Sequence, residues 1–160
     1  MPWRAAQPWR LTLSGGWPYA SPGPGSRWDL GLALERDLNR WISLSPRVTW
    51  YRLENPSNFT PACIAAPSLP CANTGPRAWT VEGDFLVNLR FGQRWIVPYV
   101  GAGFGLADFS AVPSIRRYFA LGDFLAGAEV PVSPRWALEP EIRLANHGLS
   151  SLGLGLSYSF

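Results

Sequence analysis

Carboxylates and arginines recur at every second position of several segments in this 160-residue sequence. Eight of the 11 acidic residues and four of the arginines share the polar side of these segments. The members are Asp29, Glu35, Glu82, Asp84, Asp123, Glu129, Glu139, Glu141, Arg10, Arg47, Arg90 and Arg143. Buried charges must be paired and hydrogen-bonded, so an enclosed face of this kind predicts an ion-pair network. The acidic excess leaves protonation, hydroxyl donors such as Tyr51, Tyr99 and Thr80, water, or a bound cation as open alternatives.

The single histidine is the most reactive candidate for catalysis. His147 lies near the end of the seventh alternating segment, and its place in the alternation puts its side chain on the inward face. A histidine and a serine at i and i+2 would lie on the same side of a strand as base and nucleophile. Leu149 stands where that serine belongs, and Ser150 and Ser151 are in the wrong register. The sequence therefore predicts no catalytic residue.

Three alternating glycines, Gly101, Gly103 and Gly105, superficially resemble a phosphate-binding loop. They alternate within a strand and no helix follows them, so the phosphate-loop pattern fails. We expect these small inward residues to leave space for bulky neighbours such as Tyr51 or Phe119. No cofactor and no metal site are predicted.

The two cysteines, Cys63 and Cys71, lie in a segment rich in proline, alanine and serine. An isolated pair without histidine is a poor metal site. A disulfide that closes a small loop is the better interpretation, with free thiols as the alternative. A disulfide would imply an oxidising compartment or the cell surface.

The elements that must position these residues are eight segments with a period of two, which is the period of a strand. Most have nine or more residues, close to the 9–11 of a membrane-spanning strand and longer than the usual soluble strand of about five or six. The segments are Trp9–Trp17, Trp28–Glu35, Trp41–Glu54, Trp79–Phe91, Trp95–Leu106, Tyr118–Val132, Trp136–Asn146 and Ser151–Phe160. We expect one domain over 1–160, with strands 1–3 in 8–54, a long extracellular loop over 55–77 and strands 4–8 in 78–160.

The connections between these strands alternate in length. Short turns are expected at 37–40, 92–94 and 133–135, and longer loops at 18–27, 55–77 and 108–117, although 147–150 is brief. Short turns on one side and longer loops on the other are typical of outer-membrane barrels. The sequence thus predicts an all-β fold, an eight-stranded antiparallel up-and-down transmembrane β-barrel with both termini on the short-turn side.

Tryptophans gather at the two ends of the predicted strands. Trp9, Trp41, Trp95 and Trp136 begin rising strands, and Trp17, Trp28, Trp50 and Trp79 lie near the opposite ends. An indole ring has an apolar body and one polar N–H, so it suits a membrane interface. The two bands predict an aromatic girdle.

Composition excludes several other classes of protein. All 14 basic residues are arginines that are scattered along a chain of net charge +3, so no nucleic-acid partner is expected. No stretch reaches the roughly 18 apolar residues of a membrane helix. Residues 1–20 lack the apolar core of a signal peptide, so an export signal, if there is one, is absent from this sequence.

Three segments carry a resemblance to a known group: Pro98–Leu106, Gly127–Trp136 and Leu152–Phe160. Through them the whole chain resembles the small eight-stranded outer-membrane barrels of the OmpA-like, OmpX-like and OmpW-like group. The resemblance implies a bacterial outer membrane, contact with its lipids, and an insertion signal that the outer-membrane insertion machinery reads. Leu154, Leu156, Tyr158 and Phe160 would carry that signal. The periplasmic peptidoglycan-binding domain of true OmpA proteins has no room here.

The expected function is a structural or surface-interaction role, without enzymatic activity. The lumen would be filled by side chains, and an extracellular ligand could bind the loop cap. One alternative is a narrow channel for small solutes or hydrophobic molecules. Another is a lipid A deacylase-like enzyme that uses His147, because some small outer-membrane barrels are deacylases. A soluble lipocalin-like barrel is the alternative fold.

Overall fold

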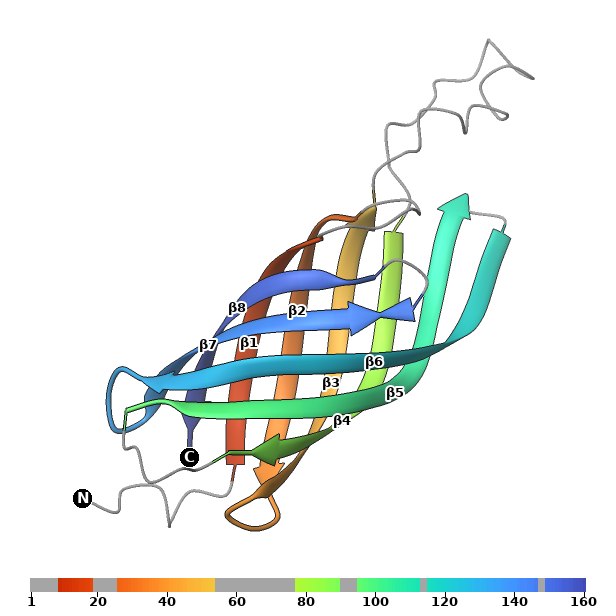
Figure 1. The fold of residues 1–160 in the computed structure, drawn as a ribbon. Helices are drawn as coiled ribbons and strands as arrows, with labels where there is room; N and C mark the ends of the chain where they lie inside the picture. The colour runs from red at the N-terminus through yellow and green to blue at the C-terminus, as the bar shows by residue number, and fades with distance from the viewer. Residues whose placement is uncertain (1–8, 19–25, 54–76, 90–94, 113–114, 147–148) are drawn as a thin grey trace.

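Eight antiparallel strands close into a barrel in a computed structural model that describes residues 9–18, 26–53, 77–89, 95–112, 115–146 and 149–160 (Figure 1). Each strand pairs with the next, and β8 pairs with β1 from Arg10↔Ser159 to Pro18↔Ser151. The strands are β1 (Trp9–Pro18), β2 (Ser26–Asp37), β3 (Ile42–Leu53), β4 (Arg77–Asn88), β5 (Val97–Val112), β6 (Ile115–Pro131), β7 (Trp136–Ala145) and β8 (Ser151–Ser159). The all-β, eight-stranded antiparallel prediction is confirmed.

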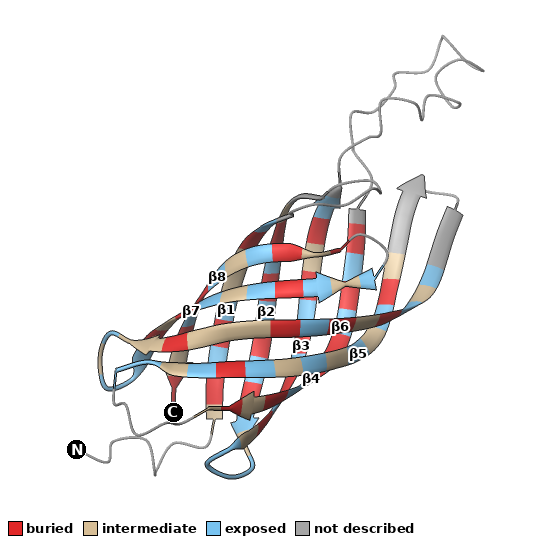
Figure 2. Cartoon of the chain, viewed as in Figure 1, coloured by how far each residue is buried: buried red, intermediate tan, exposed pale blue. Residues whose placement is uncertain are grey.

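Burial alternates along the strands, as Figure 2 shows by colour. In β2, Asp29, Gly31 and Ala33 are buried while Leu30 and Leu32 between them are exposed. A strand turns successive side chains to opposite faces of its sheet, so closing the sheet separates a polar inner face from an apolar outer face. Among the described residues there is no helix long and apolar enough to cross a membrane.

The tight turns lie at the end of the barrel where β1 begins and β8 ends (Figure 1). Between β2 and β3, the Leu38 amide donates to the Ile42 carbonyl at 2.9 Å, and the Asn39 side chain accepts from the Trp41 amide at 2.8 Å. Asparagine favours turns because its side chain bonds to nearby backbone amides. This local chemistry explains why the chain reverses where the sequence predicts a turn.

The hairpin of β5 and β6 corrects one predicted loop. Residues 108–117 were expected to form a loop, but the strands continue to Val112 and restart at Ile115, and Asp108 pairs with Tyr118. Phe109, Val112, Ile115 and Tyr118 are residue types that favour strands. Each strand of the hairpin supplies the other's backbone partners, so the pairing extends further than the period-two pattern indicates.

A second correction concerns the connection between β4 and β5. The strands were expected to run to residue 91 and to restart at residue 95, but β4 ends at Asn88 and β5 begins at Val97. The Leu89 amide donates to the Pro98 carbonyl at 2.7 Å. Two residues in such a pair normally exchange two hydrogen bonds, and proline has no N–H to return the second. The hydrogen-bond ladder between β4 and β5 therefore ends at Pro98.

The charged lumen as candidate functional site

Charged side chains from several strands meet inside the barrel because the inner face of each strand presents alternate residues. Of the lumen residues predicted from sequence, the structure describes all except Arg90, and these side chains are buried or half-buried. The arginines come from β1, β3 and β7, so each can reach carboxylates on strands across the interior. The result is two groups of ion pairs.

Arg143 on β7 is the centre of the first group. Its Nη1 lies 2.8 Å from Oε2 of Glu82 and also contacts Asp123, while Nη2 lies 2.8 Å from Oδ2 of Asp84 and 3.4 Å from Oε1 of Glu141. The guanidinium of arginine offers five N–H donors in a fixed plane, so one side chain can serve several carboxylates. These contacts join β4, β6 and β7 across the lumen.

Arg47 on β3 extends this group to the opposite wall. Its Nη1 and Nη2 donate to the two oxygens of Glu141 at 2.8 and 3.1 Å, and its Nε lies 3.3 Å from Oδ2 of Asp84. The hydroxyl of Tyr99 donates to Glu141 Oε2 at 3.1 Å. The side chain of Glu141 is therefore held by two nitrogens and one hydroxyl, and such bidentate arginine–carboxylate pairs are strong and directional.

Arg10 on β1 is the centre of the second group, near the end of the barrel where β1 begins and β8 ends. It contacts Glu35 and Glu129, and its Nη2 lies 3.1 Å from Oδ1 of Asp37. Ser43 also donates to Asp37 at 2.7 Å. Asp37 was expected in the turn at 37–40 and was not among the predicted lumen residues. The signal was present, because Asp37 continues the inward parity of Glu35 by two residues.

Threonine hydroxyls are weaker partners of several lumen carboxylates. Thr12 donates to Oε2 of Glu139 at 3.3 Å, while Oε1 of Glu139 and Oδ2 of Asp29 accept no hydrogen bond. Thr49 and Thr80 each donate to Glu82 at 3.4 Å. Hydroxyl donors were one expected answer to the acidic excess, and the structure places Tyr99 and Thr80 in that role.

A small cavity lies between β1, β2, β3, β7 and β8. Its volume is about 20 Å³, which is room for one or two water molecules. Among the groups that line it are Asp29, Arg47, Glu139, Glu141 and Arg143. Side chains rather than a wide aqueous passage thus fill this part of the lumen, as expected for eight strands.

The three alternating glycines of β5 lie beneath different side chains from those predicted. The nearest atoms to a Cβ built at Gly103 belong to Asp84 and Asp123, and at Gly101 they include the side chain of Leu86. Tyr51 and Phe119 are not among these nearest neighbours. The expectation failed because period-two parity gives the face of a residue but not its cross-strand partners.

Aromatic rings gather at both ends of the barrel. At one end Trp28 meets Trp50 edge to face at 4.7 Å between ring centroids, and Trp50 lies 6.1 Å from Trp79. At the other end Trp136 lies 4.8 Å from the ring of Tyr158. The other predicted girdle residues lie at the same two ends: Trp9 half-buried, and Trp17, Trp41 and Trp95 exposed.

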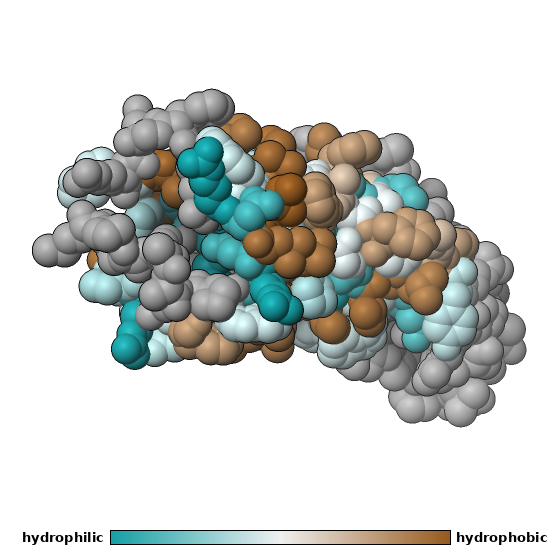
Figure 3. Space-filling view, turned by 90° about the horizontal axis from the view of Figure 1, so that it is seen from below, coloured by the Kyte–Doolittle hydropathy of each residue, from teal (hydrophilic) through white to brown (hydrophobic). Residues whose placement is uncertain are grey.

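Exposed apolar side chains occupy the wall between these ends. The predicted insertion residues belong to it, with Leu154, Leu156 and Phe160 exposed and Tyr158 half-buried on β8. Figure 3, which views the barrel from below, shows apolar side chains side by side on the visible wall. A lipocalin-like barrel would have an apolar interior, so this distribution excludes that alternative. Cys63, Cys71, Arg90 and His147 lie outside the described residues.

Comparison with known proteins identifies the fold. No protein-family model and no curated protein matches the sequence. Among solved structures, Neisserial surface protein A superposes with a TM-score of 0.71 at 15% identity, over 95% of this chain and 97% of that one. The N-terminal β-barrel domain of Pseudomonas aeruginosa OprF gives 0.68 at 13% identity, over 95% and 96%. The Yersinia pestis outer membrane protein Ail gives 0.58 at 12%, over 96% and 99%.

These similarities and the distribution of side chains define the class of protein. The chain has the fold of the small eight-stranded transmembrane β-barrels of bacterial outer membranes, and the predicted fold class is confirmed. Its own version of this fold combines an apolar wall, two aromatic ends and a lumen crossed by arginine–carboxylate contacts.

Proposed function

We propose that this protein resides in the outer membrane of a diderm bacterium, as a non-conducting barrel with a structural or surface-interaction role. The continuous apolar outer face carries the proposal. Every strand contributes large exposed apolar side chains to it, for example Leu13, Leu32, Val81, Phe104 and Leu154. Soluble proteins rarely expose an apolar patch larger than a few hundred Å², whereas lipid would cover this face.

The filled lumen supports a non-conducting role. Arg47 and Arg143 reach across the interior to Glu141 and Asp84, so charged side chains bridge strands on opposite walls. A path for small solutes would have to separate these buried ion pairs. Breaking such a pair is costly because it leaves an uncompensated buried charge.

The surface-interaction role belongs to the end of the barrel where β1 ends and β8 begins. The longest connection in the sequence, residues 54–76, joins β3 to β4 there and contains Cys63 and Cys71. An extracellular ligand, if it binds this connection, would meet a segment constrained by a disulfide between the two cysteines. Lipids and the outer-membrane insertion machinery are the other proposed partners, the latter through Leu154, Leu156, Tyr158 and Phe160.

Electrophoresis of the detergent-refolded protein tests the membrane barrel directly. The unheated sample should migrate differently from the boiled one, because a closed barrel resists detergent until it is heated. The boiled sample should also migrate differently with and without reductant if Cys63 and Cys71 are bridged. A protein that stays monodisperse in buffer without detergent would contradict the proposal.

Planar bilayer recordings distinguish the non-conducting barrel from a channel. The refolded protein should show no stepwise current in either polarity. Regular current steps whose size changes when the ion pair of Arg47 and Glu141 is altered would instead support the narrow channel. For the deacylase alternative, purified protein should release no fatty acid from lipid A. Release that is lost on His147→Ala would contradict the non-enzymatic role.

A further inference from the structure

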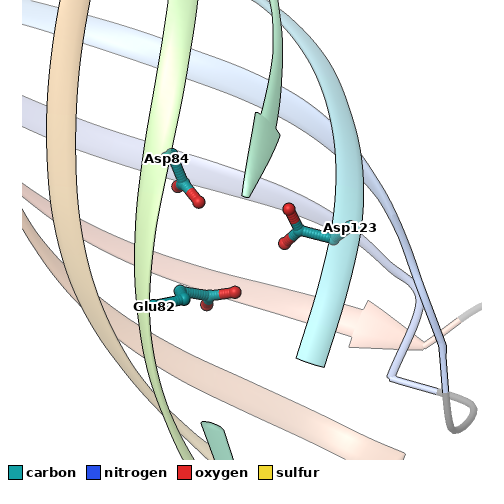
Figure 4. A group of neighbouring side chains, drawn as sticks. All are labelled: Glu82, Asp84 and Asp123. Carbon is teal, nitrogen blue, oxygen red and sulfur yellow. The ribbon is translucent and has the colours of Figure 1, made fainter. Parts of the chain in front are cut away.

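Among the described residues, the arginines that form ion pairs with carboxylates all lie in the lumen. They are Arg10, Arg47 and Arg143, and Arg143 contacts the three carboxylates that Figure 4 shows pointing toward one another. Arg52 is exposed on the outer face and takes no part in these pairs. A charge on this face needs water or an anion from outside the barrel to stabilise it.

Strand pairing brings three arginines into one row across the barrel wall. Arg52 on β3 lies opposite Arg77 on β4. Arg77 lies opposite Ser110 on β5, and Ser110 lies opposite Arg116 on β6. Residues directly opposite each other in an antiparallel sheet share one face. Because Arg52 is exposed while Tyr51 beside it is buried, this arginine row belongs to the outer face.

The arginine row lies just beyond one aromatic end of the barrel. Trp50 precedes Arg52 by two residues and Trp79 follows Arg77 by two, so both tryptophans share the outer face with the row. Their rings lie 6.1 Å apart, and Tyr118 on β6 is exposed at the same level. This is the end where β3 ends and β4 begins (Figure 1). Since tryptophan and tyrosine mark the headgroup level of a membrane, the row lies at that level or just outside it.

The row concentrates positive charge in a way that does not stabilise the sheet. Like charges directly opposite each other on neighbouring strands are destabilising, and Arg52 and Arg77 form such a pair. The neighbouring row, on the side of the tryptophans, contains one acid, Asp108, opposite Trp79. Among the described residues of these two rows, three arginines and one aspartate leave two positive charges. An anion at the membrane surface would balance them.

The outer face continues below the row in the order of the parts of a lipid. The arginines come first, then the ring pair of Trp50 and Trp79, and then the apolar side chains of Val48, Val81 and Leu106. These three apolar side chains lie opposite one another and are all exposed. A soluble anion would meet only the first of these levels, whereas a lipid would meet a charged, an amphipathic and an apolar level in turn.

We propose that Arg52, Arg77 and Arg116 bind the phosphate groups of a phosphorylated lipid of the lipid A type in the leaflet around this end of the barrel. This inference rests on the proposed location in an outer membrane. Guanidinium groups form charge-assisted, often bidentate hydrogen bonds with phosphate. Neighbouring strands lie about 4.8 Å apart, so a row from β3 to β6 extends over about 14 Å, which suits a headgroup with more than one phosphate.

Native mass spectrometry of the unsubstituted protein, refolded in a neutral detergent, tests the proposal. Increasing amounts of lipid A are added, and the fraction of barrels that carry it is compared with that for lipid A whose phosphates have been removed. The phosphorylated lipid should bind more tightly, and its binding should weaken as salt is added, because salt screens exposed charges. Heat-dependent migration of the same samples shows whether the barrel has formed, which separates a failure of this inference from a failure of the proposed role.

Substitutions assign the lipid to the arginine row. Arg52→Gln and Arg116→Gln should each raise the lipid A concentration for half-saturation about fivefold, and Arg52→Gln combined with Arg77→Gln should raise it about 25-fold. Arg40→Gln is the matched control, because Arg40 is an exposed arginine at the opposite end whose guanidinium carbon lies 4.9 Å from the ring centroid of Trp41. It removes the same charge and should leave the half-saturation unchanged.

Three results would overturn the proposal. Equal binding of the two lipids by the unsubstituted protein would leave arginines that only extend from the apolar wall to water. A loss in Arg40→Gln as large as that in Arg52→Gln would mean a general attraction of the basic protein for anionic lipid. Tighter binding of soluble heparin than of lipid A, weakened in the same variants, would assign the row to a soluble polyanion.

Discussion

One side chain, Arg143, connects three strands of the barrel through charge. It contacts Glu82 and Asp84 on β4, Asp123 on β6 and Glu141 on its own strand. Moving charges out of water carries a cost that only good geometry and further hydrogen bonds offset. The contribution of Arg143 is therefore best measured by removing it, because its carboxylate partners would remain buried.

Arg143→Met tests this dependence on a single residue. The substitution keeps an unbranched side chain but removes the guanidinium, so the free energy of unfolding should fall by about 3–5 kcal/mol. Urea unfolding in detergent micelles, followed by tryptophan fluorescence, measures it. Arg52→Met is the control, because Arg52 is exposed on β3, and its effect should stay within about 0.5 kcal/mol. Equal effects of the two substitutions would contradict a central role for Arg143.

At the scale of elements, the glycines of β5 set how closely this strand approaches the inner side of β4. A Cβ atom at Gly105 would collide with the backbone carbonyl of Val81 and lie 2.6 Å from Cα of Glu82. Backbone atoms cannot move aside as a flexible side chain can. The pairing of β4 and β5 therefore requires a residue without a side chain at this position.

Gly105→Ala should separate the two strands locally and destabilise the barrel by about 1–3 kcal/mol. Gly83→Ala is a matched control, because a Cβ at Gly83 meets no atom within 4 Å. Urea midpoints in the same micelles compare the two variants. If Gly83→Ala proved as harmful as Gly105→Ala, a general effect of replacing glycine by alanine in a strand, and not close approach, would be the cause.

The last strand shows a second property of elements, because β8 both closes the barrel and ends the chain. The amide of Phe160 donates to the Trp9 carbonyl at 3.1 Å, and its ring stacks on Tyr158 at 6.4 Å between centroids. The side chain itself is exposed. Its contribution to the stability of the folded barrel should accordingly be small, which allows a role in insertion to be tested separately.

Phe160→Ala should reduce the amount of protein that reaches the outer membrane of cells several-fold while refolding in detergent is retained. Leu152→Ala is the control, since Leu152 is an equally exposed residue at the other end of β8. Quantitative blots of membrane fractions give the first measurement, and heat-dependent migration gives the second. A parallel loss in both variants would argue against an insertion signal at Phe160.

At the scale of the whole molecule, the outer face sorts side chains by their distance from the barrel's ends. Apolar residues occupy the middle of the wall, and tryptophans and other aromatic residues lie at both ends. Leu13 pairs with Leu32 and Leu156 in the middle, whereas Val132 lies beside the turn that leads to Trp136. The side chains of Leu13 and Val132 are each more than half exposed.

This arrangement predicts a cost of charge that depends on depth in a bilayer. Leu13→Arg should destabilise the protein in lipid vesicles by about 2–4 kcal/mol, and Val132→Arg by about 0–1 kcal/mol. Guanidinium unfolding in vesicles of one lipid composition measures both. The same cost at both positions would mean that the wall does not span a bilayer along the axis of the barrel.

The sequence by itself determined which face each residue takes. Strict alternation in segments such as Ser151–Phe160 predicts strands, and parity alone assigned Arg10, Arg143 and their acidic neighbours to one enclosed face. That assignment is local, because the two-residue repeat of a strand depends only on its own backbone. The sequence also predicted the number of strands and the closed barrel.

Only the tertiary structure decided which residues meet. Pairing across strands made partners of Asp84 and Asp123 over Gly103, brought Asp37 to Arg10, and extended β5 and β6 through the expected loop. These contacts depend on register and on strand ends, which are set by hydrogen bonds between segments far apart in the chain. A local pattern predicts which face of the sheet a side chain takes. It does not predict which neighbour lies beside that side chain once the barrel has closed.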